Sequence, residues 1–305
     1  MTALRLLARC AVALALGIVS SGAMADAGQL RAKHAELREQ LRNNPYHRPI
    51  VVDSAEAGDQ LKGDVYAVLD HPYEALATSL KEPADWCAIL LLPFNTKYCH
   101  PDKNANGTVL NLRIGRKADQ PADEAYRVDF AMRPVASTPE YFEARLSSGE
   151  GPVGTRDYRI TLEAVPLDKA HTFMHLSYSY ATGGMGRIAM QAYLSTAGAH
   201  KVGFSVTGKD ESGQPVYIGG MRGALERNVM RYYLAIDAHL VSLNAPPDQQ
   251  LDKRLETWFN SSERYARQLH EMDKAQYMAL KRGEFGRQQA LLDDKSNSRP
   301  GRVAE

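Results

Sequence analysis

The stretch Gly223–Leu243, GALERNVMRYYLAIDAHLVSL, decides the fold. Its apolar side chains return every three or four residues, which is the periodicity of an amphipathic helix. They are Leu225, Val229, Tyr232, Tyr233, Ile236 and Leu240. Asn244 and Pro246-Pro247 then end the helix. No other segment of the chain gives so strong a helix signal, and the remaining elements are predicted around it.

The segment that precedes this helix, from Thr96 onward, has a period of two. Asn106-Gly107 predicts a hairpin before Val109–Ile114, because a tight turn needs positive φ at both central residues. Two later runs alternate strictly: Tyr126, Val128, Phe130 and Met132 with Arg127, Asp129 and Arg133, and Tyr158, Ile160, Leu162 and Ala164 with Arg159, Thr161 and Glu163. Residues 141–146 and 171–180 add further strands. The pattern predicts an antiparallel sheet with one wet face and one buried face.

A strand and two helices are predicted before that sheet. Val65–Leu69 is the strand. Asp70 is placed to cap a helix that continues to about Leu80, where an early Pro72 is tolerated because its missing amide would be unbonded anyway. A second helix is predicted over 83–92.

After the sheet, Gly183-Gly184 breaks the strand pattern. Met185–Ser195 is predicted to be a short helix, and Val202–Thr207 with Val216–Ile218 a hairpin. The glycine-rich segment Ser147–Gly154 lacks the Lys-Ser/Thr ending of a phosphate-binding loop, so we interpret it as a mobile loop that could gate a pocket.

This order of elements resembles the helix-grip fold of the START-like superfamily, which includes the polyketide cyclases and the birch-pollen-allergen-like proteins. Gly63–Asn95 is similar to the opening strand and helix pair of that fold, and Gly223–Leu243 to its closing helix. The resemblance runs from about Leu61 to Leu243. It implies an α+β fold in which a curved antiparallel sheet wraps around the long C-terminal helix. The helix from Met185 and the hairpin after it are departures that leave the last strand order open.

The resemblance also implies a cavity between sheet and helix that holds a lipid, a sterol or another apolar molecule. The candidate ligand-binding residues are Tyr126, Phe130, Phe142, Tyr158, Tyr178, Tyr180, Tyr232 and Tyr233. Tyrosine suits such a wall because it offers an apolar ring and one polar group. The alternative is that these are ordinary core residues, which we expect of about half of them.

Helical segments flank the predicted domain, which spans residues 61–244. An N-terminal helix and linker occupy 26–60, and Leu30, Leu37 and Leu41 give the helix one apolar face. A helical extension follows over 245–292 with the stripe Leu251, Leu255, Trp258 and Phe259. We expect both to pack on the domain, with partner binding as the alternative. Residues 293–305 are polar and predict a disordered tail.

The first 25 residues have the layout of a cleavable secretory signal. Arg5 and Arg9 precede an apolar run over Cys10–Val19, and Ala23-Met24-Ala25 predicts cleavage before Asp26. The run is shorter than the roughly 20 residues that a membrane-spanning helix needs. Cys10 opens the run instead of lying at the cleavage point, which disfavours a lipoprotein. We therefore expect export to an oxidising compartment such as the periplasm.

Cleavage at that point changes both the charge and the cysteine count. The net charge falls from +1 to −1, and this lack of basic excess disfavours nucleic acid as a partner. Cys87 and Cys99 remain as an even pair. In an oxidising compartment such a pair is expected to form a disulfide, the alternative being two buried thiols.

Motifs for catalysis and metal binding are missing from the sequence. There is no Gly-x-Ser-x-Gly elbow, and no catalytic residue is assigned. His171 and His175 would lie roughly 13 Å apart on a strand, too far to chelate one metal alone. Cys99-His100 has no second ligand pair at a metal-like spacing. We expect neither a metal nor another cofactor.

The charged residues of the long helix allow two interpretations. Glu226, Arg227, Arg231 and Asp237 are expected on a solvated helix face, and the alternative is that they point inward as acid-base groups or head-group ligands.

Three hypotheses of function follow. The first is a non-catalytic periplasmic protein that binds or transfers a hydrophobic or amphipathic, lipid-like ligand, with possible transient membrane contact. The second is a cyclase- or hydrolase-type enzyme with an inward acid or base among Glu226, Asp237, His171 and His175. The third is an envelope accessory protein that works through its terminal helices. The oligomeric state and the ligand's identity stay open.

Overall fold

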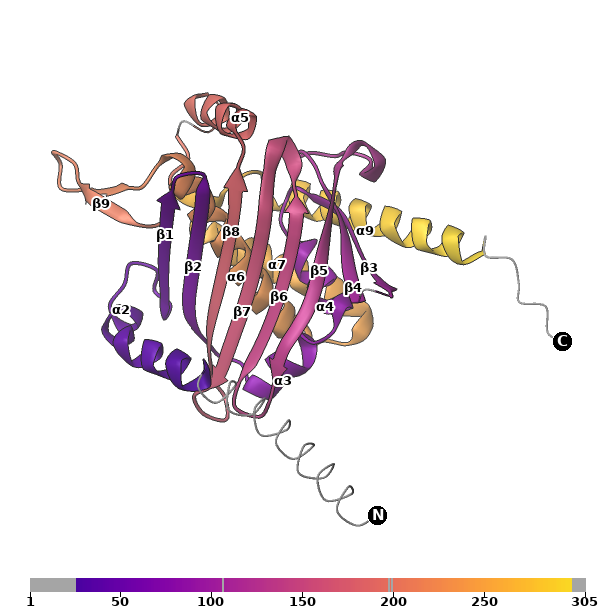
Figure 1. The fold of residues 1–305 in the computed structure, drawn as a ribbon, viewed down its shortest axis with the longest axis horizontal. Helices are drawn as coiled ribbons and strands as arrows, with labels where there is room; N and C mark the ends of the chain where they lie inside the picture. Colours follow the sequence, from indigo (N-terminus) through magenta and orange to yellow (C-terminus); the bar gives the residue numbers. More distant parts are fainter. Residues whose placement is uncertain (1–25, 106, 197, 199, 298–305) are drawn as a thin grey trace, which may run out of the picture.

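The computed structural model describes residues 26–105, 107–196, 198 and 200–297, so the predicted signal peptide and Asn106 lie outside the described residues. Its centre is an eight-stranded antiparallel sheet (Figure 1). The strands are β1 (Ile50–Ala57), β2 (Gln60–Leu69), β3 (Thr96–Asn104), β4 (Gly107–Ile114), β5 (Tyr126–Ser137), β6 (Phe142–Glu150), β7 (Thr155–Pro166) and β8 (Thr172–Thr182). Their spatial order is β1-β2-β8-β7-β6-β5-β4-β3, so the last strand returns beside β2.

Two helices lie between β2 and β3 in the chain, α3 (Tyr73–Ser79) and α4 (Pro83–Leu90), and a long helix, α6 (Gly220–Ser242), follows the sheet. Helix α6 runs across one face of the sheet (Figure 1). Its Leu225 and Val229 pack against Gly63 of β2, where an added Cβ would lie 3.0 Å from Leu225 Cγ. The close approach of helix and strand therefore depends on a residue without a side chain. The predicted helix-grip fold is confirmed.

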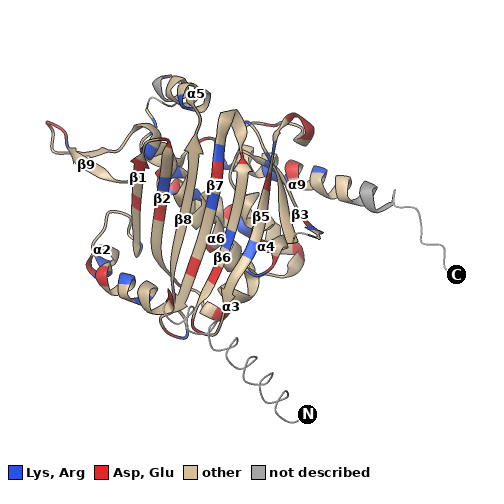
Figure 2. Ribbon diagram, in the orientation of Figure 1, with Lys and Arg blue, Asp and Glu red and all other residues tan. Residues whose placement is uncertain are grey.

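The alternation predicted for the strands is confirmed on the face toward α6. Val128, Phe130 and Met132 of β5 are buried, whereas Tyr126 at the start of the strand is exposed. Acidic and basic positions are mixed over the strands in Figure 2. In β5 the intervening residues Arg127, Asp129 and Arg133 are exposed, as the two-residue period of a strand requires.

The N-terminal segment is helical over 26–36 and in α2 (Arg38–Arg42). As predicted, its leucines are buried on the domain. They contact Tyr141, Val165 and Phe173 on the face of the sheet that points away from α6. The linker predicted within 26–60 contains an additional strand, β1, which the sequence analysis missed.

Insertions between β8 and α6 leave the order of the main sheet intact. They are α5 (Gly184–Ser195) and a separate two-stranded sheet of β9 (Val206–Lys209) and β10 (Pro215–Tyr217). In Figure 1, α5 lies beyond the end of β8, and β9 lies to the side of β1. The glycine-rich segment predicted to be a loop instead continues β6 to Glu150 and then forms the short helix η2 (Pro152–Gly154).

The C-terminal extension is helical and packs on the domain, as predicted. After η3 (Pro247–Gln249) it comprises α7 (Gln250–Glu263), α8 (Ala266–Leu269) and α9 (Lys274–Asn297). Trp258 is fully buried, with its ring centroid 5.2 Å from those of Phe94 and Tyr277. The predicted disordered tail is wrong for its first residues, because α9 continues to Asn297; residues 298–305 lie outside the described part of the chain.

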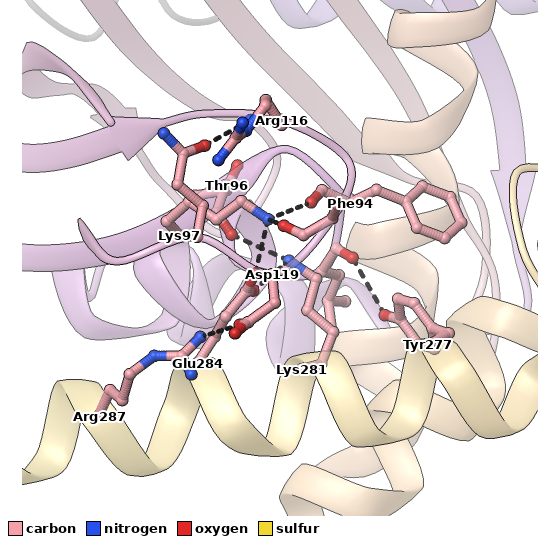
Figure 3. Close-up of polar contacts among 12 residues, drawn as sticks. Phe94, Thr96, Lys97, Arg116, Asp119, Tyr277, Lys281, Glu284 and Arg287 are labelled. Carbon is pink, nitrogen blue, oxygen red and sulfur yellow. Dashed lines mark hydrogen bonds and ion pairs between the residues drawn. The ribbon is translucent and has the colours of Figure 1, made fainter. Parts of the chain in front are cut away.

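A buried ion cluster fastens α9 to β3 (Figure 3). Lys97 Nζ donates to Glu284 Oε1 at 2.7 Å, and Lys281 Nζ donates to Glu284 Oε2 at 2.8 Å. Beside them the Tyr277 hydroxyl donates to the Leu92 carbonyl at 3.0 Å. All three charged side chains are almost completely buried. The contact therefore depends on each charge keeping its partner.

One predicted helix cap is wrong. The residue at the N-terminal cap of α3 is Pro72, and no side chain caps that helix; Asp70 is exposed. The ring of Pro72 already fixes φ near its helical value, so the chain enters α3 without a capping carboxylate. Within the described residues, no helix combines the length and the apolar composition needed to span a membrane.

Candidate functional site

A cavity of 430 Å³ lies between the sheet and α6. Its walls come from strands β4, β5, β7 and β8, from helices α4, α5 and α6, from the short helix η2, and from residues that follow α4 and β4. The cavity exists because a single helix cannot fill the whole concave face of a curved sheet. Its volume is within the range of small-molecule sites in proteins.

Aromatic residues form one wall of this cavity. Five are Phe130, Tyr158, Tyr178, Tyr180 and Tyr232, and Phe94 is a sixth aromatic residue of the lining. The Tyr158 and Tyr180 rings stack with centroids 5.3 Å apart, and Tyr232 meets Tyr178 edge-on at 5.4 Å. Burial raises the pKa of Tyr232 to about 12, so the hydroxyl stays neutral at ordinary pH. The wall thus offers flat apolar surface with neutral polar groups.

These five belong to the eight candidate residues of the sequence analysis, and the structure brings them together. The other three lie elsewhere. Tyr126 is exposed, Phe142 is fully buried in the core, and Tyr233 is buried with the Arg48 guanidinium 5.5 Å from its ring centroid. Whether the five bind a ligand remains a prediction.

A group of cations forms another part of the lining; Arg227 and Arg231 were the inward alternative of the sequence analysis, and only Lys117 was not predicted. Lys117, Arg227 and Arg231 all border the cavity, next to Asn228. Lys117 lies in the turn after β4, outside any regular element, and no local pattern marks it. Its approach to the two arginines could not be seen without the tertiary fold.

A carboxylate from the C-terminal extension is shared by the cations. Glu271 Oε1 accepts hydrogen bonds from Lys117 Nζ at 2.6 Å and Arg231 Nη2 at 2.7 Å, and Lys201 Nζ lies 3.3 Å from its other oxygen. Burial and the neighbouring Arg231 lower the pKa of Lys117 to about 8. Burial alone would raise the pKa of Glu271, but Lys117 and Arg231 lower it by more. The carboxylate therefore stays ionised.

The expectation that the charged residues of α6 are solvated is wrong. Glu226, Arg227, Arg231 and Asp237 are all at most 7% exposed. Asp237 binds Arg48 at 2.8 Å and His71 at 3.1 Å. Segments distant in the sequence supply the partners of these side chains, and the helical period cannot show this.

Glu226 is fully buried and acts as a connector. Its two carboxylate oxygens accept hydrogen bonds from Ser54 Oγ of β1 at 2.6 Å, from the backbone amides of Phe204 and Ser205 at 2.6 and 2.8 Å, and from Ser205 Oγ at 2.8 Å. The side chain thus joins α6 to β1 and to the segment before β9.

The two histidines considered as acid-base groups lie away from the cavity. His171 is on the surface beside Asp168. His175, on the sheet face away from α6, lies between Asp64 at 2.7 Å and Glu163 at 2.9 Å. Burial lowers the pKa of His175, but these two carboxylates raise it by more. None of the four residues that the enzyme hypothesis named lines the cavity.

Residues of η2 and α5 border the cavity where it meets solvent. Pro152, Val153 and Gly186 are part of the lining, and Val153 is 64% exposed with φ +58°. A Cβ on Gly186 would lie 2.7 Å from the Val153 carbonyl oxygen, so the two segments touch directly. The glycine-rich segment therefore adjoins the cavity, and its gating role remains a prediction.

The predicted disulfide is confirmed. Cys87 of α4 is bonded to Cys99 of β3, with Cα atoms 5.2 Å apart, and both residues are buried. The bond ties a helix of the helix pair to the edge strand of the sheet.

No family model matches the sequence, and no curated protein matches it. Among solved structures, the chain is similar to norcoclaurine synthase from Thalictrum flavum, at 14% identity and a TM-score of 0.33, over 49% of this chain and 90% of that one. It is also similar to a protein from Thermus thermophilus, at 11% identity and a TM-score of 0.36 over 60% and 99% of the two chains. A conserved protein from Enterococcus faecalis has 9% identity and a TM-score of 0.31 over 69% and 91%. Identities and TM-scores this low identify neither a family nor a function for this chain.

Proposed function

We propose that the mature protein is a periplasmic carrier that binds an amphipathic, lipid-like ligand in the cavity between the sheet and α6. The observation that carries this proposal is the 430 Å³ cavity itself, with its tyrosine-rich wall and a few polar groups. Apolar walls with a small number of oriented polar groups are typical of small-molecule sites. A carrier of this kind would collect and release its ligand during transient contact with a membrane surface.

The location and the ligand are tested together. The protein is purified from the periplasmic fraction under mild conditions, extracted with organic solvent, and the extract is analysed by mass spectrometry. We expect a mature chain that begins at Asp26 and one abundant lipid-like species in near-stoichiometric amount. An empty extract from correctly folded protein would contradict the proposal.

A blocked cavity is the matched control. Ala224 lines the cavity from α6, and Ala224→Phe places a ring in the space that the ligand would occupy. The variant is expected to fold and to lose the extracted species. Asn228→Phe, one helical turn further along, is a second blocking variant in case the first does not fold. Equal amounts of the species from a folded blocked variant and from the wild type would place the ligand outside the cavity.

A further inference from the structure

The charges that border the cavity have one sign. Lys117, Arg227 and Arg231 contribute to the lining, and no Asp or Glu does so among the described residues. Glu271, which pairs with Lys117 and Arg231, is held behind them and is also shared with Lys201. One carboxylate thus faces three cations, and a fourth cation, Arg227, donates to the Val202 carbonyl oxygen at 3.2 Å. Counted over the described residues, this part of the cavity carries an excess of positive charge.

Two of the cations, Arg227 and Arg231, and one residue of the aromatic wall, Tyr232, lie on α6. Arg227 and Arg231 are four residues apart on α6, as are Asn228 and Tyr232, so each pair lies on one helical face. Basic positions along α6 are visible in Figure 2. Two neighbouring stripes of α6, one cationic and one amide-aromatic, therefore border a single space.

Burial makes the excess positive charge costly. Arg227 and Arg231 are only 4% and 6% exposed. Charges removed from water are tolerated when they are paired and hydrogen-bonded, and guanidinium groups bind carboxylates and phosphates through two parallel donors. An anionic group that enters the cavity would offset the excess, and a neutral polar group would not.

We propose that the ligand is an amphiphile with an anionic head group, a carboxylate or a phosphate, which Arg231, Lys117 and Arg227 hold while the apolar part lies against the tyrosine wall. This proposal rests on the proposed function, because it names the ligand class of the same cavity. It also gives the C-terminal extension a role, since Glu271 competes with the ligand for Lys117 and Arg231.

The test compares three ligands that share a twelve-carbon chain: dodecanoate, dodecyl phosphate and dodecanol. Their affinities for the mature protein are measured at pH 7 by isothermal titration calorimetry, below their micelle concentrations, after bound lipid has been removed on a hydrophobic resin. Both anions are expected to bind at least about tenfold more tightly than dodecanol, because hydrogen bonds to charged groups are the stronger ones. The anion that binds more tightly indicates whether the natural head group is a carboxylate or a phosphate, and either result supports the proposal.

Three variants separate charge from packing. Lys117→Gln is expected to reduce the preference for anions about fivefold and to leave dodecanol binding unchanged. Lys169→Gln, in an exposed turn between β7 and β8, is the matched control and should change nothing. Glu271→Gln removes the competing carboxylate and should strengthen anion binding.

The outcomes distinguish the two proposals. Equal affinities for dodecanol and both anions, or an unchanged preference in Lys117→Gln, would overturn the anionic head group and leave the carrier function standing. Failure of all three ligands to bind folded wild-type protein would overturn the carrier function, and the head-group proposal with it.

Discussion

At the scale of single residues, the charged side chains of α6 have three different tasks. Arg227 and Arg231 border the cavity, Asp237 holds Arg48 and His71, and Glu226 joins α6 to β1. The same helix therefore carries residues that fix the fold and residues that line the cavity. Only substitution can separate these roles.

Glu226→Gln is expected to destabilise the fold by about 3 kcal/mol. The substitution removes the charge that strengthens four hydrogen bonds. It also places the NH₂ group of the new amide against backbone N–H and hydroxyl groups that now donate to the carboxylate, within a buried site. The measurement is the free energy of unfolding from urea denaturation. Glu211→Gln, in the exposed turn between β9 and β10, is the control and should remain within about 0.5 kcal/mol of wild type. Equal effects of the two substitutions would refute the connector role.

The lowered pKa of Lys117 predicts how the affinity for anions depends on pH. Its pKa is lowered from 10.5 to about 8, so the ammonium is mostly present at pH 7 and mostly lost at pH 9. Arg231 and Lys201 face the same Glu271. Lys117 and Arg231 lower the pKa of Glu271 by more than burial raises it, so this carboxylate stays ionised over the interval. The fraction of Lys117 that is protonated falls roughly tenfold from pH 7 to pH 9. The affinity for dodecanoate should therefore fall by a smaller factor, about fivefold. Calorimetry at both values checks this, and Lys117→Gln should show a flat profile; a wild-type profile that is equally flat would contradict the assignment.

At the scale of elements, the C-terminal extension is part of the domain's core. Helix α7 buries Trp258 against Phe94 of the main domain, and α9 holds Glu284 between two buried lysines. Deleting the extension would expose these groups, so truncation cannot test a partner-binding role without unfolding. A point substitution at the ion cluster is more informative.

Glu284→Gln should destabilise the protein by about 3 kcal/mol or more. The substitution leaves Lys97 and Lys281 buried without their shared counter-charge, and breaking one side of a buried pair is strongly unfavourable. Asp252→Asn offers a contrast, because its partner Arg282, also on α9, is exposed and such surface pairs contribute about 0–1 kcal/mol. Urea denaturation of both variants is the test. Similar losses of unfolding free energy in the two variants would mean that burial does not make the Glu284 cluster more important for stability than a surface ion pair.

At the scale of the whole molecule, the sequence predicted those features that repeat along the chain. Helix α6 was predicted from a local period of 3.6 and strand β5 from a local period of two, and both elements were confirmed. Strand β1 was missed because Asp53 and Glu56 interrupt its apolar residues. It is a strand because it pairs with β2 over its whole length, and its own sequence pattern does not show this.

The candidate site was only partly predictable for a related reason. Strand alternation places Phe130, Tyr158 and Tyr178 on the inner face, and the cavity contains them. Lys117 and Glu271 are separated by 154 residues and meet only in the folded chain. Charge pairs of this kind leave no periodic signal, so a helical wheel of α6 predicts solvent where the structure has a cavity.

A ligand that lies between the sheet and α6 contacts both layers, and it must leave before they separate. Binding to the folded state alone therefore raises stability by mass action, about 2.7 kcal/mol at a hundredfold excess over Kd. For a chain of this size that corresponds to a rise in Tm of about 5 °C. We expect dodecanoate to give this rise in wild type and none in Ala224→Phe, measured by differential scanning calorimetry. The same rise in the blocked variant would show that the stabilising site is not the cavity, whereas an unliganded Tm near that of wild type would show that the variant's fold is intact.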